Sequence, residues 1–202
     1  MNRYVLSEGD VLRKIKKLQY RAQILPLVMI AVSFWLTITL GHFALLRIFS
    51  MALTLLGLGA FFLTATRFRF RNRIVAPDQN SIYVPITGKV AEIRQEDLIQ
   101  VIVIQKRSTD PVEIRCPSDD CIREAGNLVI KQEGLEMSFS APHLLRIEQA
   151  RMKAGEVVSL MIGKGSCRIQ LPLGMPTLLK AGDVYQAGES RICLRTGTIS
   201  CD

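Results

Sequence analysis

ILPLVMIAVSFWLTITL at residues 24–40 and ALLRIFSMALTLLGLGAFFLTAT at residues 44–66 are the two runs that decide the fold. A helix needs roughly 17 to 25 apolar residues to cross a hydrocarbon core about 30 Å thick, so each run is long enough for one crossing. Only Gly41, His42 and Phe43 separate the two runs. The sequence therefore predicts a tight hairpin of two transmembrane helices within residues 24–66. A signal peptide has a single shorter apolar run, so we expect the hairpin to persist.

Positive charge flanks this hairpin. Residues 1–73 carry 11 Lys/Arg against 2 Asp/Glu, whereas residues 74–202 carry 15 against 16, so the hairpin and its flanks account for the net charge of +8. Basic flanks mark the cytoplasmic side of a membrane. We therefore expect an inner-membrane protein whose soluble domain faces the cytoplasm. Because the basic excess lies beside the membrane segment, the predicted partner is the phospholipid surface and not nucleic acid.

The segment before the hairpin is predicted to be an amphipathic helix. Within residues 1–22, the positions 8–21 carry Val11, Leu12, Ile15 and Leu18 on one helical face among lysines and arginines. Such a basic amphipathic segment is typical of a helix that lies in the membrane interface. The alternative is a continuation of the first transmembrane helix. After the hairpin, residues 67–80 form a basic linker that contains FRFRNR at residues 68–73.

Residues 81–199 are predicted to form a β-rich domain. Short runs of β-type residues alternate there with turn residues such as Gly163-Lys164-Gly165, a pattern typical of antiparallel sheets. We expect a membrane-anchored, mainly β protein whose soluble domain is a β-barrel or sandwich, with one helix over residues 143–152. The expected strands are SIYV at 81, KVAEI at 89, LIQVIVIQ at 98, VEIRC at 112, NLVI at 127, EMSFS at 136, EVVSLMI at 156, CRIQL at 167 and SRICL at 190.

The cysteines and histidines indicate no metal centre. The chain has five cysteines and two histidines, and its cysteines form no CxxC pair. An odd number of cysteines also fits poorly with a disulfide framework. We interpret the cysteines as reduced thiols of a cytosolic domain.

Two stretches resemble the turns of lipoyl-like, or barrel-sandwich, domains: VPITGKVAEI at residues 84–93 and LLKAGDVYQAGESRICL at residues 178–194. The order of motifs along nearly the whole chain resembles more specifically the small, membrane-anchored phosphatidylserine decarboxylases. That family has an apolar hairpin, an Arg-rich aromatic run, PADGKV, DVHxxRxP, a Gly-Ser cleavage site and K-x-G-D-x-x-x-x-G-E. After its hairpin this chain has FRFRNR at 68, PITGKV at 85, DPVEIRCP at 110, GKGSCRIQLP at 163 and LKAGDVYQAGES at 179.

The resemblance implies a specific chemistry. In that family the serine hydroxyl attacks the preceding carbonyl, the chain breaks between Gly and Ser, and the serine becomes a pyruvoyl group. The pyruvoyl carbonyl then forms a Schiff base with the amine of phosphatidylserine and accepts the electrons released as CO₂ leaves. Carried over to this chain, the bond is that between Gly165 and Ser166, and Ser166 would supply the pyruvoyl cofactor. The product would be phosphatidylethanolamine.

The chain departs from the family at two proton-handling positions. Thr87 stands where the family has the aspartate of PADGKV, and Val112 stands where it has the histidine of DVHxxRxP. Neither side chain acts as a base near neutral pH, and both self-cleavage and turnover need one. His143 is a candidate replacement if the fold brings it to Ser166. Otherwise Gly165 and Ser166 form a tight turn between two strands.

Two arginines are candidate ligands for a lipid phosphate. Arg115 and Arg146 carry guanidinium groups, which pair with phosphate through two hydrogen bonds. Surface or strand-edge arginine is the alternative interpretation of both, and Asp119 and Asp120 are interpreted as a solvated turn. Three functions remain open at this point: a pyruvoyl-dependent decarboxylase, a non-catalytic relative that binds lipid, and a lipoyl-like adaptor of a membrane complex. The sequence leaves open whether the chain forms a homo-oligomer.

Overall fold

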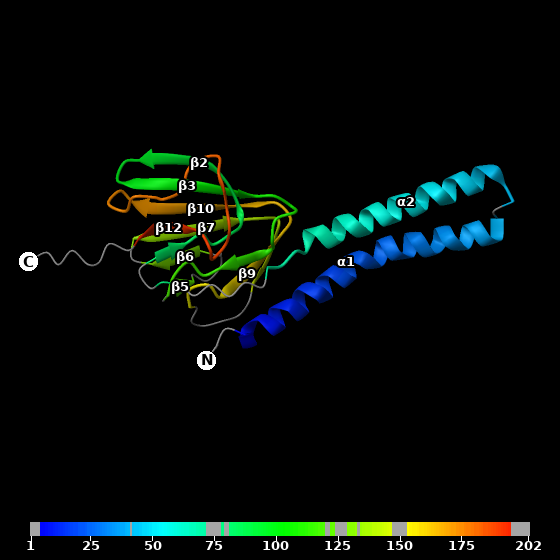
Figure 1. Ribbon diagram of the computed structural model, residues 1–202, viewed down its shortest axis with the longest axis horizontal. Helices are drawn as coiled ribbons and strands as arrows, with labels where there is room; N and C mark the ends of the chain where they lie inside the picture. Colours follow the sequence, from blue (N-terminus) through cyan, green and yellow to red (C-terminus); the bar gives the residue numbers. More distant parts are fainter. Residues whose placement is uncertain are drawn as a thin grey trace, which may run out of the picture.

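Two long helices lie side by side and project from one end of a β domain (Figure 1). The computed structural model describes residues 5–40, 42–71, 78, 81–119, 122–123, 129–132, 134–146 and 153–194. Helix α1 spans Val5–Leu40 and helix α2 spans Ala44–Arg67. Both helices are long and apolar enough to cross a membrane. The predicted helical hairpin is therefore present.

The seam between α1 and α2 is built from small and polar residues. The Ser33 and Thr54 hydroxyl oxygens lie 2.5 Å apart, and the Thr37 hydroxyl donates a hydrogen bond of 2.9 Å to Ser50 Oγ. A Cβ atom added at Gly57 would lie 2.8 Å from a side-chain atom of α1, so this glycine lets the helices approach closely. Close approach and interhelical hydrogen bonds hold helices together in lipid, where burial of apolar area gives no driving force.

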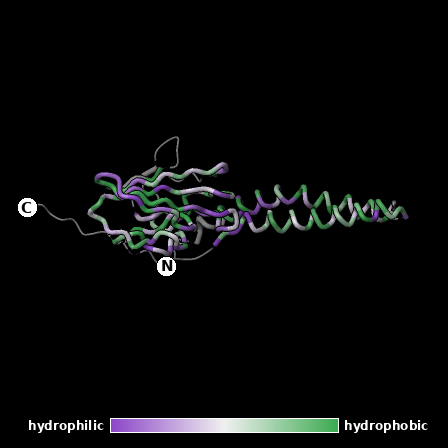
Figure 2. Tube along the Cα trace, turned by 90° about the horizontal axis from the view of Figure 1, so that it is seen from above, coloured by the Kyte–Doolittle hydropathy of each residue, from purple (hydrophilic) through white to green (hydrophobic). Residues whose placement is uncertain are grey.

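The outward faces of the hairpin are apolar. Figure 2 shows hydrophobic residues along most of both helices beyond the β domain. Several large side chains are more than half exposed, among them Phe34 (68%), Trp35 (62%) and Leu55 (70%). An apolar surface of this extent marks an interaction site with a protein or a membrane. Together with the length of the helices, it fits a hairpin surrounded by lipid.

The amphipathic helix predicted over residues 8–21 is the first part of α1, which continues without a break into the apolar run. Continuation of the first long helix was the alternative to a separate interfacial helix. Its apolar residues Val11 and Ile15 are buried against Val112, Val157 and Leu160 of the β domain. The apolar face of this segment therefore packs on protein.

The β domain contains short antiparallel strands, and each of the nine predicted runs overlaps one of them. The structure adds β5, β8 and β11. The strands are β1 Ser81–Tyr83, β2 Gly88–Glu96, β3 Ile99–Lys106, β4 Glu113–Arg115, β5 Ile122–Arg123, β6 Val129–Gln132, β7 Leu135–Ser140, β8 His143–Arg146, β9 Val157–Ile162, β10 Gly165–Pro172, β11 Val184–Tyr185 and β12 Arg191–Leu194.

The strands form open sheets. The largest has the order β11-β2-β3-β10-β7-β6-β5, a second has the order β4-β9-β8, and β1 pairs with β12. One core of buried residues includes Ile102, Ile169 and Met137 from the large sheet and Ile114 and Met161 from the second sheet. Among the described strands no barrel closes, so the structure confirms a mainly antiparallel β domain without a closed barrel.

The helix predicted over residues 143–152 is wrong at its start. Residues 143–146 form strand β8, in which His143 pairs with Ile162 and Arg146 pairs with Ser159. Residues 147–152 lie outside the described part of the chain. An apolar run this short does not separate strand from helix by its periodicity. Pairing with β9 makes residues 143–146 a strand.

Candidate functional site

The GKGS segment follows strand β9 where the β domain meets the helices. We call this side of the domain the helix-proximal end; Val112 and Ile162 pack there against α1 and Phe68. Gly163 has a φ of +82°, which suits glycine, and it turns the chain out of β9. Figure 1 shows β9 beside the base of the helices. The segment from residue 163 to residue 166 therefore lies next to the helical hairpin in the fold.

Gly165 and Ser166 begin a regular strand. Gly165 pairs with Lys106 of β3, and Ser166 pairs with Gln105 of β3 and with Ser140 of β7. Strand β10 therefore has a hydrogen-bonded neighbour on both sides at Ser166. The bond between Gly165 and Ser166 is part of this strand, and the bend between β9 and β10 is at Gly163 and Lys164. The two residues therefore do not themselves form the tight turn that the sequence suggested.

Packing explains the glycine at position 165. A Cβ atom there would clash with Met161 Sδ and would lie 3.0 Å from both Ala141 Cβ and the Ser140 carbonyl oxygen. A contact of 3.0 Å is at the limit that real Cβ atoms show. The close approach of β10 to β7 and β9 therefore requires glycine, whatever the chemistry of the following serine.

Thr87 and Val112, which correspond to proton-handling residues in the motifs that the sequence resembles, are both buried. The Thr87 hydroxyl oxygen accepts a hydrogen bond of 3.1 Å from the Ala187 backbone N–H. Val112 is fully buried in the cluster that includes Val11 and Ile15 of α1. Its N–H donates to the Arg69 carbonyl at 2.9 Å, which ties β4 to the chain that follows α2. Thr87 thus stabilises a turn, and Val112 anchors both helices to the β domain.

His143 lies at the helix-proximal end in a different sheet from Ser166. It begins β8 and pairs with Ile162, and its side chain is exposed. Within the described residues no hydrogen bond joins the imidazole to the Ser166 hydroxyl. The structure brings His143 close to α1, where it lines a groove with Leu18 and Arg21.

Arg115 holds the segment after α2 in place. Its guanidinium donates to the Gly155 carbonyl at 2.9 Å and to the Arg71 carbonyl at 2.7 Å, and it lies 6.0 Å from the centre of the Phe70 ring. The arginine is buried, so these contacts give it a structural role at the junction. Arg146 is paired in β8, and its side chain lies outside the described part of the structure.

The two adjacent aspartates fall partly within the described structure. Asp119 Oδ1 accepts a hydrogen bond of 2.9 Å from the Ala154 N–H. Asp120 lies outside the described residues. Asp119 therefore orders a turn, which agrees with its interpretation from the sequence.

Two buried ionisable residues were missed at the sequence level. Lys106 is buried, and its ammonium donates to the carbonyls of Gly163 (2.9 Å), Asp110 (3.1 Å) and Arg107 (3.2 Å). Burial lowers the pKa of Lys106, while Asp110 and Glu113 act against that shift. Three donated hydrogen bonds to carbonyl oxygens tie the Lys106 side chain to the GKGS segment and to the turn that contains Asp110.

Glu113 is the second buried charge. It is 2% exposed, and among the described residues its Oε2 has no hydrogen-bond partner. Burial raises the pKa of Glu113, although backbone N–H groups and the Arg115 and Arg71 charges favour the carboxylate. The only sequence signal for either residue is the interruption of apolar β-type runs by charges in QKRSTDPVEIR at residues 105–115.

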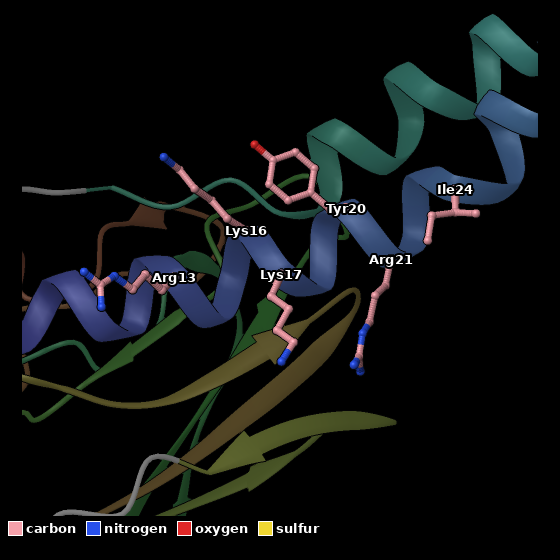
Figure 3. A pocket seen from close by; sticks show the side chains of 6 residues that line it. All are labelled: Arg13, Lys16, Lys17, Tyr20, Arg21 and Ile24. Atoms are coloured by element: carbon pink, nitrogen blue, oxygen red, sulfur yellow. The ribbon is translucent and has the colours of Figure 1, made fainter.

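The helix-proximal end also has two open hollows. One, of about 470 Å³, lies along the basic part of α1. Figure 3 shows Lys17 and Arg21 pointing to one side of the helix and Lys16 and Tyr20 to the other. The second, of about 570 Å³, lies between α1 and β8. We call it the α1–β8 groove; it is lined by Leu18, Arg21, Ala22, Phe68, Pro142, His143, Leu144, Leu145 and Ile162.

Comparison of the chain with protein-family models, with curated proteins and with solved structures finds no match. The geometry of the helix-proximal end is therefore the basis on which a function is proposed. That geometry combines a basic helix, a groove with an apolar lining and a tightly packed GKGS segment.

Proposed function

We propose that this chain is a phosphatidylserine decarboxylase-like membrane protein that binds phospholipid at the cytoplasmic face of the inner membrane without decarboxylating it. The proposal keeps the family resemblance for the order of motifs. It replaces the pyruvoyl chemistry with recognition of lipid by the helix-proximal end.

The burial of Val112 carries this proposal. Val112 stands where the family motif has histidine, and in this chain the position is fully buried beneath Val11 and Ile15 of α1. A side chain in this environment makes an anchoring contact and has no proton to exchange. Thr87, at the other position, uses its hydroxyl oxygen to accept from Ala187. Both proton-handling positions therefore serve packing or turn structure.

The distribution of charge and apolar surface supports action at a membrane. The outward faces of both helices expose large apolar side chains, whereas basic residues gather at the ends that join the β domain. Basic residues at such a position contact anionic head groups, each worth about 1 kcal/mol near the surface. A β domain attached at these ends of the helices would lie next to phospholipid head groups.

The pyruvoyl enzyme remains the second candidate, because GKGS lies at the helix-proximal end. In that version the chain would split into residues 1–165 and 166–202, and Ser166 would carry the pyruvoyl group. The third candidate, a lipoyl-like adaptor, rests only on the turns in VPITGKVAEI at residues 84–93 and LLKAGDVYQAGESRICL at residues 178–194. An adaptor has no reason to distinguish lipid head groups.

A lipid-retention measurement tests the proposal. The full chain is purified in a neutral detergent and titrated with phosphatidylserine, phosphatidylglycerol or phosphatidylcholine of identical acyl chains, and bound lipids are counted by native mass spectrometry. We expect retention of the anionic lipids at concentrations where phosphatidylcholine is lost. Equal retention of all three lipids would contradict lipid recognition and favour the adaptor.

A further inference from the structure

We infer that the α1–β8 groove binds one anionic phospholipid, with its phosphate on Arg21 and an acyl chain along Leu144 and Leu145. This inference rests on the proposed function and assigns it a site and a lipid class. Four observations carry it. They are the position of the groove along α1, the residues that line it, the lack of an internal hydrogen bond or ion pair at Arg21 among the described residues, and the nearness of the groove to the apolar part of the hairpin.

The groove lies at the level where head groups meet acyl chains. Arg21 is the last basic residue before the apolar run that begins at Ile24, and one helical turn separates the two residues (Figure 3). Tyr20, on the same turn as Arg21, is 66% exposed, and tyrosine is enriched at membrane interfaces. A phosphate at Arg21 would therefore have its acyl chains beside the apolar part of the hairpin.

The lining matches the two chemical parts of a phospholipid. From β8 the groove has Pro142, Leu144 and Leu145, the last of which is 37% exposed. From α1 it has Leu18 and Ala22 beside Arg21. No Asp or Glu occurs among its described lining residues, so nothing there repels a phosphate. An apolar floor beside one guanidinium and an exposed imidazole suits an acyl chain joined to a negative head group.

Arg21 is available for a ligand. Within the described residues its guanidinium makes no hydrogen bond and no ion pair with the protein. Arg115, by contrast, donates to two backbone carbonyls. A guanidinium offers phosphate two parallel hydrogen bonds, and hydrogen bonds between charged groups are stronger than those between neutral groups. Arg21 can therefore take a phosphate without breaking an internal contact.

A bilayer lipid fits the groove better than a soluble phosphate. Arg21 lines both the groove and the neighbouring hollow along α1, whose lining includes the exposed Ile24, so a molecule with acyl chains can enter from the bilayer past this residue. A soluble phosphate ester would leave the leucine side chains in water. Burial of apolar surface is worth about 25 cal/mol per Å², which favours a ligand that covers them.

The test uses the full chain in detergent and the lipid titration described above, with three variants. Arg21→Gln removes the phosphate contact, and Leu145→Trp fills the groove without changing charge. Arg67→Gln is the matched control, because it removes the same charge at the end of α2 and lies outside the groove lining. Circular dichroism and thermal unfolding verify that each variant is folded.

We expect R21Q to weaken retention of phosphatidylglycerol and phosphatidylserine about fiftyfold and L145W about tenfold, whereas R67Q, which removes only one basic charge near the surface, weakens it about fivefold. Anionic lipid retained equally by R21Q and R67Q would overturn the groove assignment while leaving lipid recognition intact. Displacement of the lipid by millimolar glycerol 3-phosphate would identify a soluble phosphate as the ligand and would also overturn it. A wild-type chain without head-group preference would instead contradict the proposed function itself.

Discussion

The hairpin and the β domain bury opposite kinds of residue. In the hairpin, Ser33 and Ser50 are buried in the seam while Phe34 and Trp35 face outward. In the β domain, residues such as Ile102 are inside. The difference shows that one sequence is adapted to two solvents. Hydroxyl groups form the contact surface in lipid, and apolar side chains form the core in water.

The two regions meet at Val112. Helix α1 contacts the β domain there through buried apolar side chains, as in the core of a water-soluble protein. Val11 and Ile15 of α1 pack on Val112, Val157 and Leu160 as a β-domain core would. Below this level, α1 has its apolar side chains on the outside. The junction therefore marks where α1 passes from contact with the β domain to an apolar outward face.

The largest expected effect comes from Val112→His, which introduces the histidine of the motif that DPVEIRCP resembles. Because the site is fully buried among apolar side chains, an imidazole without a partner should lower the free energy of unfolding of the β domain by about 3 kcal/mol. Chemical denaturation of the full chain in detergent measures it. Val184→His, at a residue that is 62% exposed, should change stability by less than about 0.5 kcal/mol. Equal effects of the two variants would refute the junction as described.

Gly165→Ala should cause the next largest loss of stability. The added methyl group clashes with Met161 Sδ, and overpacking of this kind costs about 1–3 kcal/mol. Gly174→Ala is the control, because a Cβ atom there has nothing within 4 Å. Thermal unfolding compares the two variants. A G165A variant as stable as G174A would show that packing does not require glycine at position 165. It would then favour a role for Gly165 in cleavage of the bond to Ser166.

Glu113→Gln should produce a pH-dependent gain in stability of about 1–2 kcal/mol. Because burial raises the pKa of Glu113, the folded state holds its proton above the ordinary value of 4.5 while the unfolded state releases it. The wild type therefore loses stability as the pH rises from 4.5 through the folded-state pKa, and E113Q does not.

Unfolding midpoints of wild type and E113Q between pH 4.5 and pH 8 measure this gain. Glu136→Gln, on strand β7, serves as the control and should run parallel to the wild type. A constant difference between E113Q and the wild type across this range would show that Glu113 stays ionised in the folded protein.

The smallest expected effect lies in the hairpin. Ser33 and Thr54 share an interhelical hydrogen bond, and such bonds contribute about 0.6 kcal/mol on average in a membrane protein. A double-mutant cycle of Ser33→Ala and Thr54→Ala, followed by detergent-induced unfolding, isolates that coupling. A coupling of zero would mean that close packing at Gly57 alone holds the seam.

Sequence patterns predict the parts of this fold that depend on local composition. The hairpin follows from the length of two apolar runs, and the longer strands follow from β-type runs between turns. Strand β8 does not follow, because residues 143–146 take their conformation from pairing with β9. The burial of Lys106 and Glu113 is likewise set by packing between distant segments. For Val112, the sequence shows a valine where the resembled motif has histidine, but it does not show that helix α1 covers the position.

The integrity of the chain tests the central claim most directly. Intact mass spectrometry of the wild type and of Ser166→Ala, both purified from the membrane without reducing or acidic treatment, reads the bond between Gly165 and Ser166. We predict one full-length species of 22.6 kDa for the wild type, with the S166A variant differing only by the loss of one oxygen atom. Fragments corresponding to residues 1–165 and a pyruvoyl-bearing 166–202, present in the wild type and absent from S166A, would contradict the account and establish the enzyme.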